Sequence, residues 1–172
     1  MKMKVIMMLA AFALTASAAA AQELPRKVQN VEVLDLDGKP AKLPHFGEKN
    51  LMIFYVDPDR HKQNEDFTIE LEQNHRAESD NIYGFGVMNL KDAPMVPNGM
   101  ARNMAKKRTA KNGATVLADQ NRILSTAWAL GDCNNQFVLM IVSKEGELVF
   151  LRKGVLSDAD KEAFYETIEK YK

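Results

Sequence analysis

The sequence contains one cysteine, Cys133, among its 172 residues. A lone cysteine cannot form a disulfide within the chain, so stability has to come from packing, and the thiol is either buried and inert or free. An excess of charge of either sign is also missing, because 23 basic residues face 23 acidic ones. Without a basic field, the chain is not expected to bind DNA or RNA.

The amino terminus has the pattern of a secretory signal peptide. Lys2 and Lys4 precede an apolar run over residues 5–14, and small residues then lead to Ala21. This order predicts cleavage after Ala21. The apolar run is shorter than the ~20 residues of a membrane-spanning helix, and no cysteine follows it to carry a lipid anchor. We therefore expect an exported protein whose mature part, residues 22–172, has no membrane segment.

The mature chain shows apolar strands that alternate with helices. A hairpin is expected over 28–36 with a return at 42–43, strands over 50–56, 82–89, 115–118, 136–143 and 148–152, and helices over 60–76, 100–111, 122–130 and from Ser157 onward. Such alternation is typical of a single α/β domain with a mostly parallel sheet and helices on both faces. The hairpin near the carboxyl terminus adds an antiparallel edge.

Three helix starts can be placed by their capping residues. Asp59 is expected to cap the helix over 60–76, because its carboxylate can accept from N–H groups of the first turn. Asn98 is a candidate cap for the following helix. Ser157 and Asp160 are three residues apart, a spacing that resembles a capping box.

Two stretches of the mature chain resemble the thioredoxin-like superfamily. The first is the apolar strand over 50–56 with the helix after it. The second comprises Val116 to Asp119, Trp128 to Leu130, Phe137 to Val142, the Lys144-Glu-Gly146 turn, Phe150, Lys153-Gly154 and Leu156-Ser157. Within the superfamily the chain is most similar to the YtfJ-type periplasmic family. Its Pro97-Asn-Gly-Met100 loop, which leads into a charged helix, also resembles that family. The resemblance implies a thioredoxin-like fold in the bacterial periplasm, with a central mixed sheet, helices on both faces and an N-terminal β-hairpin extension.

The chain departs from redox-active members of the superfamily at the redox site. Those proteins carry a C-x-x-C pair at the start of the helix after the first core strand, where the helix terminus lowers the thiol pKa. Asp59 and Lys62 stand at these positions. A cis-proline is also expected before the fourth core strand, but Cys133 is followed by Asn-Asn-Gln. The resemblance therefore implies the fold without the dithiol reaction.

The resemblance also implies that two polar stretches, as in other thioredoxin-like folds, face each other at one edge of the sheet. The carboxyl ends of strands are where open α/β sheets bind ligands. The candidate residues are Asp57, Asp59, Arg60, His61, Lys62, Asp132, Asn134 and Asn135. We expect this edge to bind a periplasmic protein or a small ligand. No cofactor is expected. Gly84-Phe85-Gly86 lies inside a strand and is not a phosphate loop, since no glycine-rich turn leads from it into a helix.

Cys133 leaves two alternatives open. It could act as a peroxidatic or thiol-exchange residue, or it could join Asp57, Asp59 and His61 as ligands of a carried metal ion. The simpler interpretation is a small buried side chain, a common role for a free cysteine. Reactivity would require a lowered thiol pKa and solvent access.

Two further patterns have ordinary structural explanations. A basic helix carries Arg102, Lys106, Lys107, Arg108 and Lys111. Such a helix usually has a solvated face, although it could also dock an acidic partner. The methionines over 88–104 are expected to fill the core rather than to bind a soft metal.

Export predicts a defined mature amino terminus. Amino-terminal sequencing of the exported protein is expected to begin at Gln22, because Ala21 is the small residue at the cleavage site. An Ala21→Arg variant should keep its leader or be cut elsewhere. A mature protein that still contains Lys2 and Lys4 would contradict the prediction.

Overall fold

The computed structural model describes residues 23–172, and the predicted signal peptide, residues 1–21, lies outside them. The strands are β1 (Arg26–Lys27), β2 (Glu32–Leu34), β3 (Pro40–Lys42), β4 (Asn50–Val56), β5 (Ile82–Asn89), β6 (Val116–Asp119), β7 (Phe137–Val142) and β8 (Glu147–Lys153). The helices are the short 3-10 helix η1 (Pro58–Arg60), α1 (Glu65–Asn74), α2 (Asn98–Asn112), α3 (Ile123–Ala127) and α4 (Asp158–Glu169). No helix in the described part of the chain is long and apolar enough to cross a membrane.

All eight strands join one mixed sheet in the order β1-β8-β7-β4-β5-β6-β2-β3. β4 pairs parallel with β5, and β5 with β6, but β7 runs antiparallel to both β4 and β8. The central mixed sheet implied by the resemblance is therefore confirmed, whereas the mostly parallel sheet expected from the alternation of strands and helices is wrong. The chain leaves β6 at its carboxyl end, forms the short α3 and enters β7 at that same end of the strands. A parallel β7 would need a connection that crosses to the opposite end.

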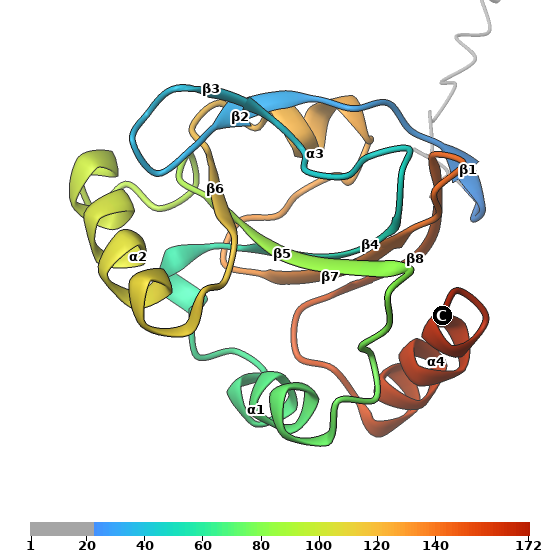
Figure 1. Ribbon diagram of the computed structural model, residues 1–172. Helices are drawn as coiled ribbons and strands as arrows, with labels where there is room; N and C mark the ends of the chain where they lie inside the picture. The colour runs from blue at the N-terminus through green and yellow to red at the C-terminus, as the bar shows by residue number, and fades with distance from the viewer. Residues whose placement is uncertain (1–22) are drawn as a thin grey trace, which may run out of the picture.

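Helices lie on both faces of the sheet (Figure 1), and an apolar layer is buried on each face. Successive side chains of a strand point to opposite faces, so Leu51 and Ile53 of β4 join the layer around Trp128, under α3 and the β2–β3 hairpin. Phe54 and Val56 point the other way, toward the layer formed with α1 and α4. Helices on both faces are thus confirmed. α2 lies apart from the other helices, on the β6 side.

The β2–β3 hairpin confirms the predicted N-terminal extension. Val33 pairs with Ala41, and Leu34 of β2 pairs with Ala118 of β6, which attaches the hairpin to the sheet edge. Its return strand ends at Lys42, one residue before the predicted end. β1 was not predicted, because a strand of two residues carries no apolar pattern.

α4 begins as its sequence predicts, and α2 does not. The Ser157 hydroxyl accepts from the Asp160 N–H at 3.1 Å, and the Asp160 carboxylate accepts from the Ser157 N–H at 3.0 Å, which completes a capping box. Asn98 is the first helical residue of α2 and makes no capping bond, since Pro97 occupies the cap position. The proposed cap at Asn98 is therefore wrong.

Candidate functional site

A polar residue lies at the carboxyl end of each of the three parallel strands, β4, β5 and β6. Asp57 follows β4, Asn89 ends β5 and Asp119 ends β6, and all three are fully buried. Because β7 runs antiparallel to β4, the loop over 131–136 enters the sheet at this same edge. The two polar stretches identified in the sequence therefore meet here, where α/β folds commonly bind ligands.

The carboxylate of Asp57 joins the two stretches. One oxygen accepts from the Asp59 N–H at 2.9 Å, and the other accepts from the Asn135 N–H at 2.7 Å. The Asp57 N–H donates to the carbonyl of Gln136 at 3.2 Å. Hydrogen bonds to an ionised acceptor are stronger than neutral ones, so Asp57 holds both loops in one arrangement.

Asp59 does not cap the following helix, and that prediction is wrong. Asp57 caps η1 instead, with Pro58 in the first position, where its missing N–H costs nothing. The chain then turns, and α1 begins only at Glu65, after Asn64 in the left-handed conformation with φ +62°. The expected long helix over 60–76 is thus a 3-10 turn followed by a shorter α-helix.

Two side chains between η1 and α1 bind backbone groups of β7 and of the β8–α4 connection. The Gln63 carbonyl accepts from the Phe137 N–H at 2.7 Å, at the start of β7. The Asn64 amide donates to Gly154 O and accepts from the Leu156 N–H, both at 2.8 Å. Neither residue was predicted to belong to the site, because the sequence of a polar stretch does not indicate which backbone group a Gln or Asn side chain will bind.

Most of the predicted residues reach solvent at this edge. The exposed ones are Asp59, Arg60, His61, Lys62, Asp132, Asn134 and Asn135. In the second loop, the Asp132 carboxylate accepts from the Asn134 N–H at 2.9 Å, and Asn135 turns the chain with φ +55°. No cis peptide bond occurs in this loop. The edge therefore presents a mixed set of charges and amides on two braced loops.

Cys133 points into the core. Its side chain is 3% exposed and belongs to the apolar layer around Trp128. Burial raises the pKa of the Cys133 thiol to about 11, against the opposing effect of Lys153. Its sulfur lies 3.6 Å from the carbonyl oxygen of Gly131. The thiol is therefore protonated and shielded at neutral pH, the opposite of a reactive cysteine.

A buried polar cluster behind Cys133 was missed in the sequence. The Asn89 amide donates to the Asp92 carboxylate at 2.6 Å and to the Cys133 carbonyl at 3.4 Å. Arg122 donates to Asp92 at 2.8 Å. Burial opposes ionisation of Asp92, but bonds from Arg122 and Asn89 outweigh it and lower the pKa of that carboxyl. The only signal was that Asn89 closes an apolar strand, as Asp57 does.

Asp119 organises the start of α3 beside this cluster. Its carboxylate accepts from the N–H groups of Ile123 and Leu124, each at 2.9 Å, and from the Tyr55 hydroxyl at 3.2 Å. Burial raises the pKa of Tyr55, and the nearby Asp119 carboxylate adds to the effect. These bonds stabilise the fold next to the edge and leave the Asp119 carboxylate fully buried.

The metal alternative finds no ligand set in this arrangement. Among residues 23–172, no three His, Cys, Asp or Glu side chains are placed to hold a metal ion. Both carboxylate oxygens of Asp57 are engaged by backbone N–H groups, and Cys133 is turned away from His61 into the core.

A hollow of about 560 Å³ adjoins the first loop, between the sheet and α2. Asp59 and His61 line it together with the sheet residues Phe54, Gly86 and Val116. Its lining is mostly apolar, with a few polar groups, as in many small-molecule sites. The edge predicted from sequence therefore continues into a recess that the sequence did not reveal.

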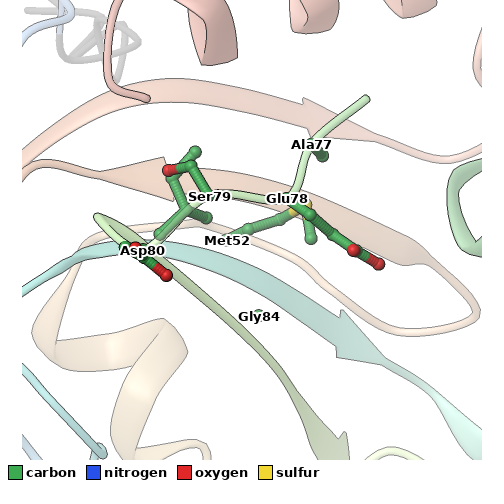
Figure 2. Close-up of a pocket in the computed structure, with 7 residues that line it drawn as sticks. Met52, Ala77, Glu78, Ser79, Asp80 and Gly84 are labelled. Atoms are coloured by element: carbon green, nitrogen blue, oxygen red, sulfur yellow. The ribbon is translucent and has the colours of Figure 1, made fainter. Parts of the chain in front are cut away.

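A second hollow, of about 600 Å³, lies on the same face at the amino ends of β4 and β5. Met52 and Gly84 form its floor, and residues 77–80 cross above them (Figure 2). Figure 2 shows the Glu78 and Asp80 side chains pointing away from each other. These carboxylates do not converge on one point, so this hollow is the weaker candidate.

No family model matches the chain, and no curated protein matches it in sequence. Solved structures do match. The pneumococcal exposed lipoprotein thioredoxin of Streptococcus pneumoniae has a TM-score of 0.56 at 19% identity, over 83% of this chain and 99% of that one. A peroxiredoxin-like protein from Aquifex aeolicus has a TM-score of 0.62 at 11% identity, over 88% of each chain. The thioredoxin domain of a thiol-disulfide oxidoreductase from Bacteroides vulgatus has a TM-score of 0.55 at 15% identity, over 85% of this chain and 95% of that one.

The protein has a thioredoxin-like fold. At these identities the likeness concerns the fold and not the activity. Within this thioredoxin-like frame, Asp59 lies in η1 and Lys62 in the turn after it, the two positions where the resemblance would place a cysteine pair. The one cysteine, Cys133, lies on the opposing loop with its thiol in the core.

Replacing Asp57 is expected to destabilise the protein strongly. Asp57→Ala removes a buried carboxylate and leaves two N–H groups without their acceptor, which should lower the free energy of unfolding by about 3 kcal/mol. Urea denaturation measures the change. The matched control is Asp59→Ala, an exposed carboxylate, which should change stability by less than about 0.5 kcal/mol. Equal losses in the two variants would contradict the clamp assigned to Asp57.

Proposed function

We propose that this chain is an exported, redox-inactive thioredoxin-like protein of the YtfJ type, which binds a protein or a small ligand at the edge formed by residues 57–62 and 132–136. One observation carries the proposal: both loops are fixed by Asp57 and expose polar side chains, while the only thiol is buried. These properties favour binding of a ligand at this edge over a reaction of the thiol.

Redox inactivity is supported by what occupies the reactive positions. Asp59 and Lys62 replace the cysteine pair, and neither side chain can attack a disulfide. The buried thiol of Cys133, whose pKa is raised to about 11, offers almost no thiolate at neutral pH. A single-thiol peroxidase or exchange enzyme would need the reverse of these properties.

A binding role is supported by the stiffness of the edge. Ordering a flexible loop opposes association, so loops that are already fixed bind with less entropic loss. Here Asp57, Gln63 and Asn64 hold the loop over residues 57–64 through backbone groups of the Cys133 loop, of β7 and of the β8–α4 connection, respectively. The charges and amides of the edge are thus presented in a set geometry, which favours one partner over others.

Export is supported by the leader pattern over residues 1–21. One structural neighbour is described as an exposed lipoprotein thioredoxin. The periplasm is the compartment proposed for the mature chain.

The pH dependence of alkylation tests the inactive thiol. Iodoacetamide should label Cys133 slowly at pH 7, and the rate should rise about tenfold per pH unit toward pH 11, because only the thiolate reacts. Protein unfolded in urea is the positive control, and Cys133→Ser is the blank. Rapid labelling at pH 7, or oxidation of Cys133 by dilute peroxide, would support the single-thiol alternative instead.

Photocrosslinking in the producing cell tests the binding edge. A photoreactive amino acid at Asn134 should give a discrete adduct whose intact mass distinguishes a protein partner from a small molecule. The control position is Lys170, exposed near the opposite end of β4, where Tyr171 O accepts from Asn50. The same adducts at both positions, or none at Asn134, would refute a binding site at this edge.

A further inference from the structure

The recess beside the first loop exists because small residues face each other across it. Alternate residues of β5 point toward α2, and one of them is Gly86, which leaves the sheet bare between Phe54 and Val116. Above it, α2 presents Ala101 and Ala105, four residues apart on one helix face. Neither wall supplies a side chain large enough to fill the space.

The recess is apolar inside and basic at its mouth. The floor residues Phe54 and Met88 are only half-buried, so apolar surface remains open to an occupant. Arg108 of α2 lines the recess, and its guanidinium makes no hydrogen bond or ion pair with any residue from 23 to 172. His61 lines it too, and its Nδ1 lies 3.0 Å from the Pro58 carbonyl oxygen, which leaves Nε2 available.

The guanidinium of Arg108, unpaired within the described part of the chain, gives the recess a binding group for an anion. The single carboxylate that lines the recess is Asp59, on the η1 side. Arg108 and His61 also line the recess, whereas Lys107, exposed on the same helix, does not. A guanidinium also matches the planar geometry of a carboxylate, to which it can donate two parallel bonds.

We infer that the recess binds a small amphipathic carboxylate, with its aliphatic chain between α2 and the sheet and its head group at Arg108. The inference rests on the proposed binding function, because Asp59 and His61 belong to both the edge and the recess. A slender chain fits a hollow of about 560 Å³ roofed by Ala101 and Ala105, whereas a protein surface would not enter it. Met104, 60% exposed at the mouth, is flexible enough to close over an aliphatic chain.

Calorimetry on the exported protein tests this ligand class. Dodecanoate, below its micellar concentration, should bind one molecule per chain and about tenfold more tightly than dodecanol, since only the carboxylate gains a charged partner. Dodecyltrimethylammonium should bind no better than dodecanol. Equal affinity for all three would overturn the role of the basic mouth.

Variants separate the head group from the chain. Arg108→Gln should weaken dodecanoate about tenfold and leave dodecanol unchanged, while Lys107→Gln, the matched charge loss on the next residue, should change neither. Gly86→Val and Ala105→Leu fill the recess from opposite walls and should each abolish binding of both probes. A Cβ at Gly86 would lie 3.4 Å from Val116 Cγ2 and 3.8 Å from Phe54 O, at van der Waals distance.

The outcomes distinguish this inference from the proposed function. If no probe binds while Asn134 still yields its crosslink, the amphipathic ligand is wrong and the binding edge stands. If dodecanoate binds as expected and Asn134 yields no crosslink, the edge proposal fails and the recess is a separate site. Binding that survives both filled variants would place the ligand elsewhere and overturn the inference.

Discussion

Two backbone N–H groups, from Asp59 in one loop and Asn135 in the other, donate to the same buried carboxylate of Asp57. A buried charge without such donors would be strongly unfavourable, so the two loops and the carboxylate stabilise one another. An amide at this position has a single acceptor oxygen and would leave one N–H without a partner. The conformation of η1 and the path of the Cys133 loop both follow from this interaction.

Much of the fold could be predicted because apolar patterns are local. Each core strand from β4 to β8 was found within a few residues, and the Ser157–Asp160 capping box was identified from spacing alone. The apolar pattern alone could not predict the antiparallel placement of β7, because direction depends on where a chain returns and not on strand composition. The error at Asp59 has a similar origin: two aspartates flank Pro58, and only the three-dimensional approach of Asn135 decides which is buried.

The sequence predicted which stretches form the candidate site but not the hydrogen bonds that hold them together. The two polar stretches do face each other, because β7 runs antiparallel to β4 and the loop before β7 therefore lies at the carboxyl end of β4. Partners such as Gln63 with Phe137, and Asn89 with Asp92, join atoms far apart in sequence or hidden in a loop, and no periodicity marks them. The recess could not be predicted for another reason. Gly86 and Ala105 leave space because their side chains are absent or small, and such space forms a recess only when the sheet and α2 lie opposite each other.

The burial of Cys133 has a consequence for how the protein behaves in an oxidising compartment. A lone exposed thiol there would be captured by small disulfides or would link two copies of the chain covalently. A protonated thiol that is 3% exposed avoids both fates. In the proposed periplasmic location, the protein would be exposed to disulfide-forming enzymes without its one cysteine reacting, provided that the loop braced by Asp57 stays closed over it.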